Sequence, residues 1–171
     1  MTDKSVLRLR DTDRAAVDHA LQPLFAVLRE CLPTAEAREV GSTAVPELVG
    51  KGDVDVLVRV PLADFAAASR TLEQRFACNE DQHASATFRS YLVSPPKHGL
   101  PPVTIQMTAI GASTEVFDAF LAVLRTDETM RERYGTLKRS WEGRGMAGYR
   151  RAKARFIRNA LRGSETPDRG L

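Results

Sequence analysis

Cysteine is scarce in this sequence, and so are long apolar runs. The two cysteines, Cys31 and Cys78, lie in unrelated segments without the spacing of metal ligands. No apolar run approaches the roughly eighteen residues of a membrane-spanning helix, and the first residues lack the apolar core of a secretory signal. We therefore expect reduced thiols in the core of a cytoplasmic protein that has no membrane partner.

The motifs of several common enzyme classes are also missing. The three histidines, His19, His83 and His98, show neither the arrangement of a catalytic triad nor the spacing of metal ligands. The sequence contains no Gly-x-Ser-x-Gly pattern and no Walker-type glycine loop. These absences argue against a hydrolase of the triad type and against a P-loop kinase.

The composition that remains is that of one folded domain. The 171 residues are 43% hydrophobic and 27% charged, which is ordinary for a globular protein and argues against disorder. A chain of this length can bury a sizeable core. No segment resembles a linker or a low-complexity block, so we expect a single domain over residues 1–162 and a polar, flexible tail at 163–171.

The hydrophobic pattern alternates between helical and strand-like periods. Apolar residues at helical spacing predict a first helix, capped by Asp11 or Thr12, and a two-residue alternation predicts a late strand. Because helices and strands intermix, the fold class is α/β (α+β), with a helical C-terminal third. The expected elements are helices at 11–32 and 61–76, strands at 37–40, 54–60, 87–93 and 103–109, and a helical region from 113 to 162.

One stretch, EVGSTAVPELVGKGDVDVLVRV at residues 39–60, combines two features that suit phosphate chemistry. Asp53 and Asp55 are two residues apart at the start of an apolar strand, so both carboxylates face one side. Two such charges repel each other unless a cation lies between them, and carboxylates bind Mg²⁺ together with substrate phosphates. Gly41 and Ser42 lie in the preceding turn, which we expect to lead from a strand into a helix. Such a turn offers close backbone approach, the free amides of a helix start and the Ser42 hydroxyl to an anion. The stretch therefore predicts phosphate binding beside a catalytic, metal-binding carboxylate pair.

Each half of this pattern has a simpler explanation when taken alone. Gly41 and Ser42 are typical of an ordinary turn and helix cap, and Asp53 follows Gly52 as many turn residues do. The combination ahead of a buried strand favours the functional interpretation over these two. We include Thr43, the next residue of the turn, in the predicted phosphate-binding set.

The helical C-terminal third repeats a small pattern. Tyr134, Lys138 and Trp141 are spaced at i, i+4 and i+7, and the trio of Tyr149, Lys153 and Phe156 has the same spacing. At about 100° per residue, each trio falls on one helix face. A lysine on such a face either extends along apolar surface to water or binds an anionic ligand, and we add Lys138 and Lys153 to the phosphate-binding candidates.

Basic residues also dominate the end of the chain. Seven of them and no acidic residue occur between Arg144 and Arg162. Those at positions 151, 155, 158 and 162 fall on the helix face opposite Lys153. They form either a solvated face or a nucleic-acid surface. No aromatic residues interleave with them, as binding of single strands would favour, so the solvated face is preferred.

Two blocks of the chain resemble a known family. The block VGSTAVPELVGK followed by VDVLV, and the later segments RYGTLKRSW and GYRRAKARFI, resemble the GrpB family of the nucleotidyltransferase superfamily. The resemblance implies a mixed sheet flanked by helices, with the site between the sheet and the C-terminal helices. It also implies Mg²⁺-dependent transfer on a nucleotide or another phosphorylated small molecule. By matching positions, Lys51 and, through a loose alignment, Arg89 join the phosphate-binding set.

The sequence departs from the family pattern at several places. Glu47 replaces a usual glycine and Gly52 a usual proline, and Thr104 and Gln106 replace a His-x-His pattern in the strand VTIQMTA. That strand also lacks the third carboxylate of the superfamily. An alternative is therefore a phosphate-binding module without catalytic activity. The alternation of the strand predicts that the face of Thr104, Gln106 and Thr108 lines the pocket wall opposite the Gly41-Ser42 turn, with Gln106 on the side of Asp55.

Overall fold

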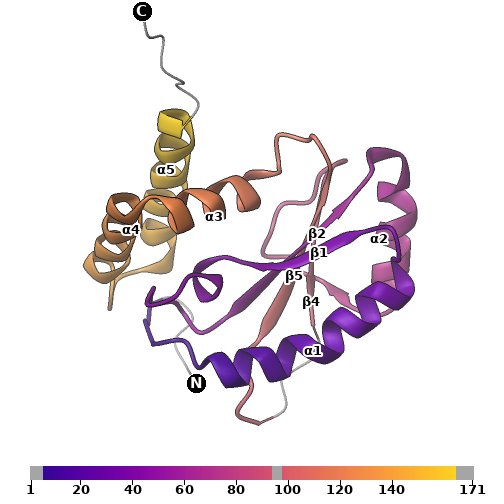
Figure 1. Ribbon diagram of the computed structural model, residues 1–171, viewed down its shortest axis with the longest axis horizontal. Coiled ribbons are helices and arrows are strands. Elements are labelled where there is room, and N and C mark those ends of the chain that lie inside the picture. The colour runs from indigo at the N-terminus through magenta and orange to yellow at the C-terminus, as the bar shows by residue number, and fades with distance from the viewer. Residues whose placement is uncertain (1–5, 94–97, 165–171) are drawn as a thin grey trace, which may run out of the picture.

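The computed structural model describes residues 6–93 and 98–164, of which 163 and 164 are described by their backbone alone. The predicted tail at 163–171 therefore lies almost wholly outside the described residues. Within the described part, a mixed α/β fold forms around one sheet (Figure 1). This arrangement confirms the predicted fold class.

The sheet has five strands in the order β1-β2-β5-β4-β3. The central pair, β2 and β5, runs parallel, and the other neighbours run antiparallel. The predicted strands at 54–60 and 103–109 have the predicted bounds, whereas the short edge strand β3 was not anticipated. The strands are β1 (Glu36–Val40), β2 (Val54–Val60), β3 (Ala77–Cys78), β4 (Phe88–Leu92) and β5 (Val103–Ala109).

Two helices, α1 (Arg14–Cys31) and α2 (Phe65–Glu73), cover one face of this sheet (Figure 1). Because side chains alternate along a strand, β2 and β5 present only aliphatic residues to these helices. They form one buried cluster together with α1 and α2 residues such as Leu28 and Leu72. The aliphatic residues are Val54, Val56, Val58 and Val60 of β2 and Val103, Ile105, Met107 and Ala109 of β5.

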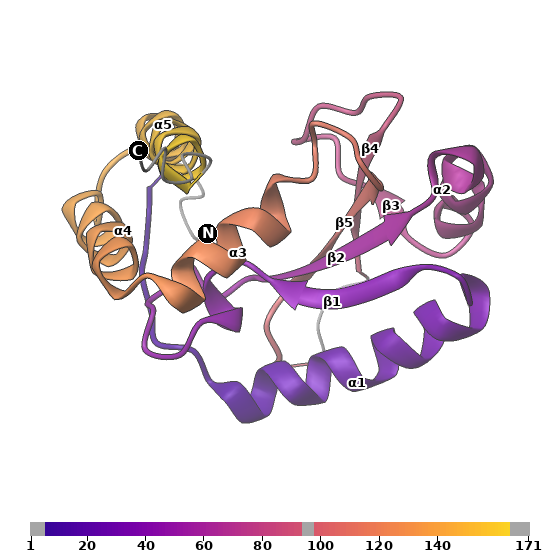
Figure 2. The same ribbon diagram turned by 45° about the horizontal axis from the view of Figure 1, so that its top comes forward.

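Three helices, α3 (Val116–Thr126), α4 (Glu128–Ser140) and α5 (Met146–Ser164), lie at the other side of the sheet (Figure 2). A second buried cluster joins them to Leu57 of β2. Its centre is aromatic, with the ring centroids of Phe120 and Tyr134 5.1 Å apart and those of Tyr134 and Phe156 5.3 Å apart. The helical module therefore meets the sheet next to the start of β2.

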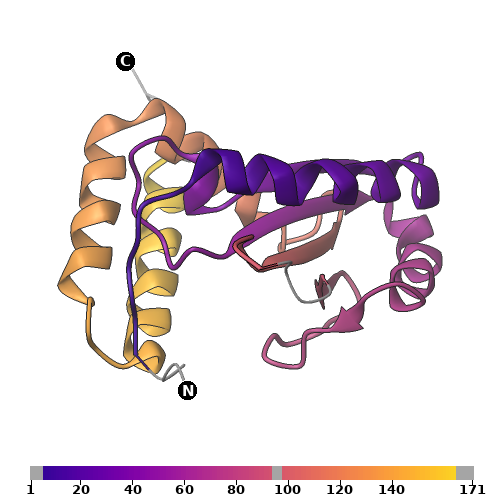
Figure 3. The same ribbon diagram turned by 90° about the horizontal axis from the view of Figure 1, so that it is seen from below.

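The segment before α1 runs along α4 and α5 and connects them to the centre of the molecule (Figure 3). Leu7 is fully buried, and it exchanges backbone hydrogen bonds with the turn between α4 and α5, at Gly143 and Arg144. Three residues later, Arg10 and Gly50 exchange two backbone hydrogen bonds of 2.8 and 3.1 Å. The segment thus fixes the loop that precedes β2.

Several local predictions were wrong. Asp13, rather than Asp11 or Thr12, caps α1, because its carboxylate accepts a hydrogen bond from the backbone of Ala16. The region from 113 to 162 is mainly helical, as predicted, but it is divided into α3, α4 and α5. A new helix starts after Asp127, whose side chain accepts from the backbone of Met130, and the backbone turns again at residues 141–145.

Neither cysteine is a fully buried core thiol. Cys31 is half-buried at the edge of the cluster beneath α1, and Cys78 is exposed on the short edge strand β3. The expectation of two core thiols was therefore wrong for Cys78, because this residue lies on a two-residue edge strand that no sequence pattern marks. Among the described residues, no helix has the length and apolarity needed to cross a membrane.

Candidate functional site

Asp53 and Asp55 lie at the start of β2, on the side of the sheet that faces the C-terminal helices. Asp53 directly precedes the strand, and its carboxylate pairs with the Nζ atom of Lys51 at 2.6 Å. Burial alone would raise the pKa of Asp53, but the charge of Lys51 and its hydrogen bond lower it below the ordinary value. Asp53 is therefore ionised, and Lys51 is its present counter-ion.

The carboxylate of Asp55 has two different neighbours. Its Oδ1 atom accepts a hydrogen bond from Nε2 of Gln106 at 3.1 Å. On the other side, a β-carbon placed on Gly41 would lie only 3.0 Å from Oδ2, so glycine alone lets the carboxylate approach the turn so closely. Burial, followed by the negative charge of Asp53, raises the pKa of Asp55. The prediction that Gln106 faces Asp55 is confirmed.

The turn after β1 brings Gly41 and Ser42 to this carboxylate, but in a different form from the expected helix start. Gly41 has φ 79°, a conformation that favours glycine, and a single three-residue 3-10 turn follows at Ser42–Ala44. The Ser42 hydroxyl packs on Gly50, where an added β-carbon would lie 2.8 Å from Oγ. The hydroxyl of Thr43 is buried without a hydrogen-bond partner among the described residues.

The two family departures in the following loop both have unusual backbones. Glu47, at the place of a usual glycine, has φ 63°, which is strained for a residue with a β-carbon. Gly52, at the place of a usual proline, has φ 82°, whereas proline is confined to about −65°. The loop between the turn and Asp53 therefore follows a path that the family's proline would not permit.

Lys138 of α4 lies inside the site rather than on its surface. The residue is 3% exposed, its Nζ atom donates to the carbonyl oxygen of Val49 at 2.8 Å, and it lies 4.9 Å from the ring centroid of Tyr134. Burial, followed by the positive charge of Lys153, lowers the pKa of Lys138 to about 7. The negative charges of Asp53 and Asp55 act in the opposite direction, so the ammonium group lies within electrostatic reach of both carboxylates.

Lys153 of α5 approaches the same cluster from a second helix. The residue is half-buried, and its charge acts to lower the pKa of both Asp53 and Asp55. Burial raises the pKa of the neighbouring Tyr149, which is 3% exposed. The predicted inward face of α5 is confirmed, and the arginines at 151, 155, 158 and 162 are all exposed.

Arg89 does not join this group, and its inclusion was wrong. On β4, Phe88 stacks on Phe117 of α3, with ring centroids 6.2 Å apart, so Phe88 faces the C-terminal helices. Arg89 therefore points to the opposite face, which it shares with Tyr91 of the core beneath α1 and α2. Its guanidinium donates to the backbone carbonyls of Ser85 and Phe88. Strand alternation separates Arg89 from Asp55, because Arg89 pairs with Met107, whose side chain belongs to the opposite face.

The residues present fit one divalent cation better than two. The described residues contain no group of three or more His, Cys, Asp or Glu side chains that could hold a metal. Asp53 and Asp55 do form a close pair, in which the charge of Asp53 raises the pKa of Asp55. A bound cation would relieve this repulsion, and Mg²⁺ binds through as few as one or two carboxylates plus substrate phosphates.

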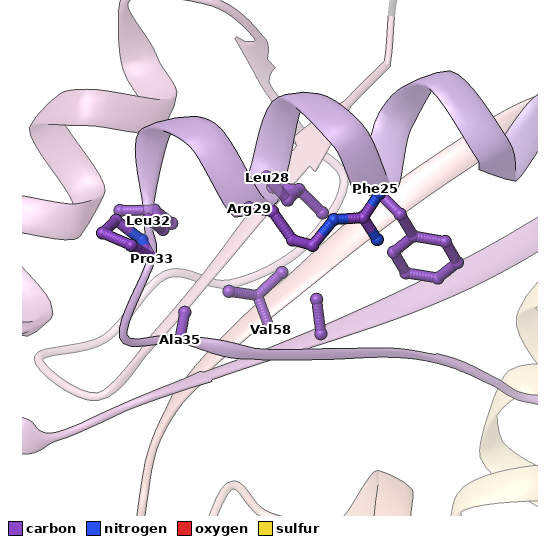
Figure 4. Close-up of a pocket in the computed structure, with 8 residues that line it drawn as sticks. Phe25, Leu28, Arg29, Leu32, Pro33, Ala35 and Val58 are labelled. Carbon is purple, nitrogen blue, oxygen red and sulfur yellow. The ribbon is translucent and has the colours of Figure 1, made fainter.

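A cavity on the other face of the sheet is separate from this site. A space of about 310 Å³ opens between α1 and the sheet (Figure 4), on the face opposite Asp55. Apart from Arg29 it is lined by apolar side chains, so it does not belong to the carboxylate site. Its lining residues are Phe25, Leu28, Arg29, Leu32, Pro33, Ala35, Ala37 and Val58.

Two contributors to the site were not found by sequence reasoning. Gly50 leaves room for the Ser42 hydroxyl, and the carbonyl of Val49 receives Lys138. The first glycine of the motif GKG is Gly50, and its place directly before Lys51 could have drawn attention to it. Nothing in the sequence indicates that a backbone carbonyl will receive a lysine from a distant helix.

Comparisons with known proteins agree on the family. The family model described as GrpB protein matches residues 11–162. A UPF0157 protein of Vibrio cholerae serotype O1 is 31% identical over 151 residues, which cover 88% of this chain and 79% of the relative.

Solved structures show the same fold. The crystal structure of the conserved protein GrpB from Enterococcus faecalis has a TM-score of 0.65 at 19% identity, covering 92% of this chain and 99% of that one. The Cid1 poly(U) polymerase bound to MgGTP has a TM-score of 0.53 at 15% identity over 75% of this chain, which spans only 42% of that protein. The fold is thus nucleotidyltransferase-like, and the chain belongs to the GrpB family.

Proposed function

We propose that this chain is a metal-dependent nucleotidyltransferase of the GrpB type, acting on a nucleotide or a related phosphate ligand. One observation carries the proposal: a half-buried carboxylate, Asp55, is held beside a second one, Asp53, within the electrostatic reach of Lys51, Lys138 and Lys153. Perturbed ionisable groups of both signs in one place are typical of functional sites.

Each residue has a separate task under this proposal. Asp53 and Asp55 hold Mg²⁺, which when bound neutralises charge on the phosphates of the ligand. Ser42 offers its hydroxyl from the Gly41 turn. Lys51 is 39% exposed and is free to leave Asp53 for a phosphate oxygen once a cation takes its place.

The two lysines of the helical module complete the phosphate side. Lys153 is half-buried and lies close enough to influence both carboxylates, so it contacts phosphate oxygens. Lys138 lies deeper and bonds to Val49, so it supplies positive charge behind the ligand. A fold neighbour, Cid1, was solved with MgGTP and with MgATP, which is consistent with this use of the fold.

A binding module without turnover is the second candidate. The β5 face opposite the turn carries Thr104, Gln106 and Thr108 in place of the superfamily's third carboxylate. Such a site would retain the ligand and the cation but lack a group that activates an acceptor. Incubation with labelled nucleoside triphosphates distinguishes the two, because only the enzyme releases pyrophosphate.

Calorimetric titration with Mg²⁺ and a panel of nucleotides tests the proposal. Asp55→Asn is expected to abolish Mg²⁺-dependent binding, because it removes the only one of the two carboxylates that lies next to Gly41. Asp64→Asn is the matched control, since Asp64 is exposed in the turn before α2 and its loss changes the net charge equally. Equal binding by the parent and Asp55→Asn would refute the assignment.

The Lys153→Met variant tests the phosphate side separately. Methionine fills similar space, so folding is expected to be preserved, while binding of a polyphosphate ligand weakens by about 1.5–3 kcal/mol, the usual worth of a charge-assisted hydrogen bond. Thermal melts with and without Mg²⁺-nucleotide measure this effect. A ligand-induced shift equal to that of the parent would mean that Lys153 only extends to water.

A further inference from the structure

The two oxygens of the Asp55 carboxylate are used differently. Oδ1 accepts a hydrogen bond from the amide nitrogen of Gln106 at 3.1 Å. Oδ2 faces Gly41, and a β-carbon added to that glycine would lie 3.0 Å from this oxygen. The carboxylate therefore has one oxygen occupied on the β5 side and one turned toward the Gly41-Ser42 turn.

The side-chain amide of Gln106 is not free to turn its oxygen, in place of its nitrogen, toward Asp55. Gln106 is 2% exposed. In the parallel pairing of β2 with β5 its backbone lies opposite Leu57, which is the next residue after Asp55 on the same face of β2. Its carbonyl oxygen Oε1 is buried and has no hydrogen-bond partner among the described residues. The amide is thus oriented with its N–H groups toward the carboxylate and its oxygen turned away from it.

We propose that Gln106 is a positioning residue that orients Asp55 and restricts the site to one divalent cation, placed on the Gly41-Ser42 side. A cation on the β5 side of Asp55 would meet the N–H protons of Gln106 instead of an oxygen ligand, and the repulsion excludes it. This inference rests on the proposed function, because it assumes that Asp53 and Asp55 bind the first cation.

A single cation has a consequence for the reaction. In two-metal sites one ion stabilises the attacking oxygen and the other the leaving oxygen. If Asp53 and Asp55 held a single cation, it would neutralise charge on the phosphates of the donor ligand alone. Activation of an acceptor then depends on a side chain or on the acceptor itself.

Counting bound Mn²⁺ by electron paramagnetic resonance tests the inference without any activity assay. The parent is expected to bind one Mn²⁺ per chain. Gln106→Glu places a carboxylate where the amide stood, and it is expected either to bind a second Mn²⁺ or to bind the first about tenfold more tightly. Leu92→Glu is the matched control, because Leu92 lies on the same sheet face, two strands away from Asp55, and is 44% exposed.

A second variant keeps the test decisive if Gln106→Glu folds poorly. Gln106→Met has nearly the same volume but no donor, and it is expected to bind one Mn²⁺ about tenfold more weakly because Asp55 is no longer oriented. Two Mn²⁺ ions in the parent, or unchanged binding in both variants, would overturn the inference and leave the proposed function intact. No Mn²⁺ binding in the parent would overturn the proposed function as well.

Discussion

The two faces of the central strand pair differ in what they bury. Beneath α1 and α2, β2 and β5 contribute only aliphatic side chains, and every one of them belongs to a single buried cluster. On the face toward α3–α5, the same two strands contribute Asp55, Arg59, Gln106 and two threonines, with Leu57 as the apolar contact. The first face stabilises the fold through apolar burial, whereas the second includes Asp55, whose charge is disfavoured by burial.

The electrostatics of the second face show this cost. Burial raises the pKa of Asp55 and lowers that of Lys138 to about 7, so each charge is disfavoured in the place where it stands. A protein that needed only a core there could use apolar residues instead. We infer that the polar face is retained for ligand binding, and the following variants test this contrast.

The largest effect is expected from Ile105→Ala on the aliphatic face. Ile105 is fully buried, and removing its methyl groups leaves a cavity that should lower the free energy of unfolding by about 2–5 kcal/mol. Gln106→Met changes the adjacent residue, which faces the other way, and should alter stability by less than about 1.5 kcal/mol. Urea unfolding measures both. Comparable losses in the two variants would remove the contrast between the faces.

The next effect is expected from Lys138→Met on the polar face, and it depends on pH. The pKa of Lys138 falls from 10.5 to about 7 in the folded state, so between these values the unfolded chain binds more protons. The stability of the parent should therefore rise with pH over this window. At pH 6 the variant should be more stable than the parent by about 2–4 kcal/mol. The charge no longer has to be buried, and this gain outweighs the loss of the bond to Val49, of the contact with the Tyr134 ring and of the attraction of the two aspartates.

Arg151→Met is the control for this experiment. Arg151 is exposed on α5, and this substitution also removes one positive charge. It should leave the rise of stability with pH unchanged. Denaturant midpoints between pH 6 and pH 10.5 provide the measurement. A Lys138→Met variant that is less stable than the parent at pH 6 would show that the ammonium group stabilises the fold.

The smallest effect is expected in the loop that leads to the polar face. Glu47 has φ 63° and is exposed, so Glu47→Gly should relieve backbone strain and raise the free energy of unfolding by about 0.5–1 kcal/mol, after the entropy of the unfolded glycine is subtracted. Glu47→Ala removes the same charge but keeps the strain. Thermal melts that show the same gain for both variants would attribute the effect to charge.

The sequence was most informative where one local rule decides the outcome. Strict alternation located β5, and the apolar run located β2, both with the observed bounds. The Gly41-Ser42 turn and the aspartate pair were found because their chemistry is carried by adjacent residues. Alternation also predicted that Gln106 faces Asp55, which the 3.1 Å hydrogen bond confirms.

The sequence was less informative where distant segments decide the outcome. The two-residue strand β3 exists only through its pairing with β4, and no periodicity marks so short a strand. Arg89 was placed in the site by its motif alone. Side chains alternate along β4, and Phe88 faces the C-terminal helices, so Arg89 faces the other way. The burial of Lys138 depends on Val49, 89 residues earlier in the chain, and its pattern alone did not distinguish burial from extension to water.

The contacts of the N-terminal segment determine the order in which parts of the molecule can fold during synthesis. The Ser42 hydroxyl packs on Gly50, and Arg10 binds Gly50 through two backbone hydrogen bonds. The same segment is fixed at Leu7 by Gly143 and Arg144, which leave the ribosome more than a hundred residues later. Contacts of such long range close late. On the ribosome, the aliphatic side of the sheet can therefore assemble first, while the ligand site remains unfinished until Gly143 and Arg144 have emerged.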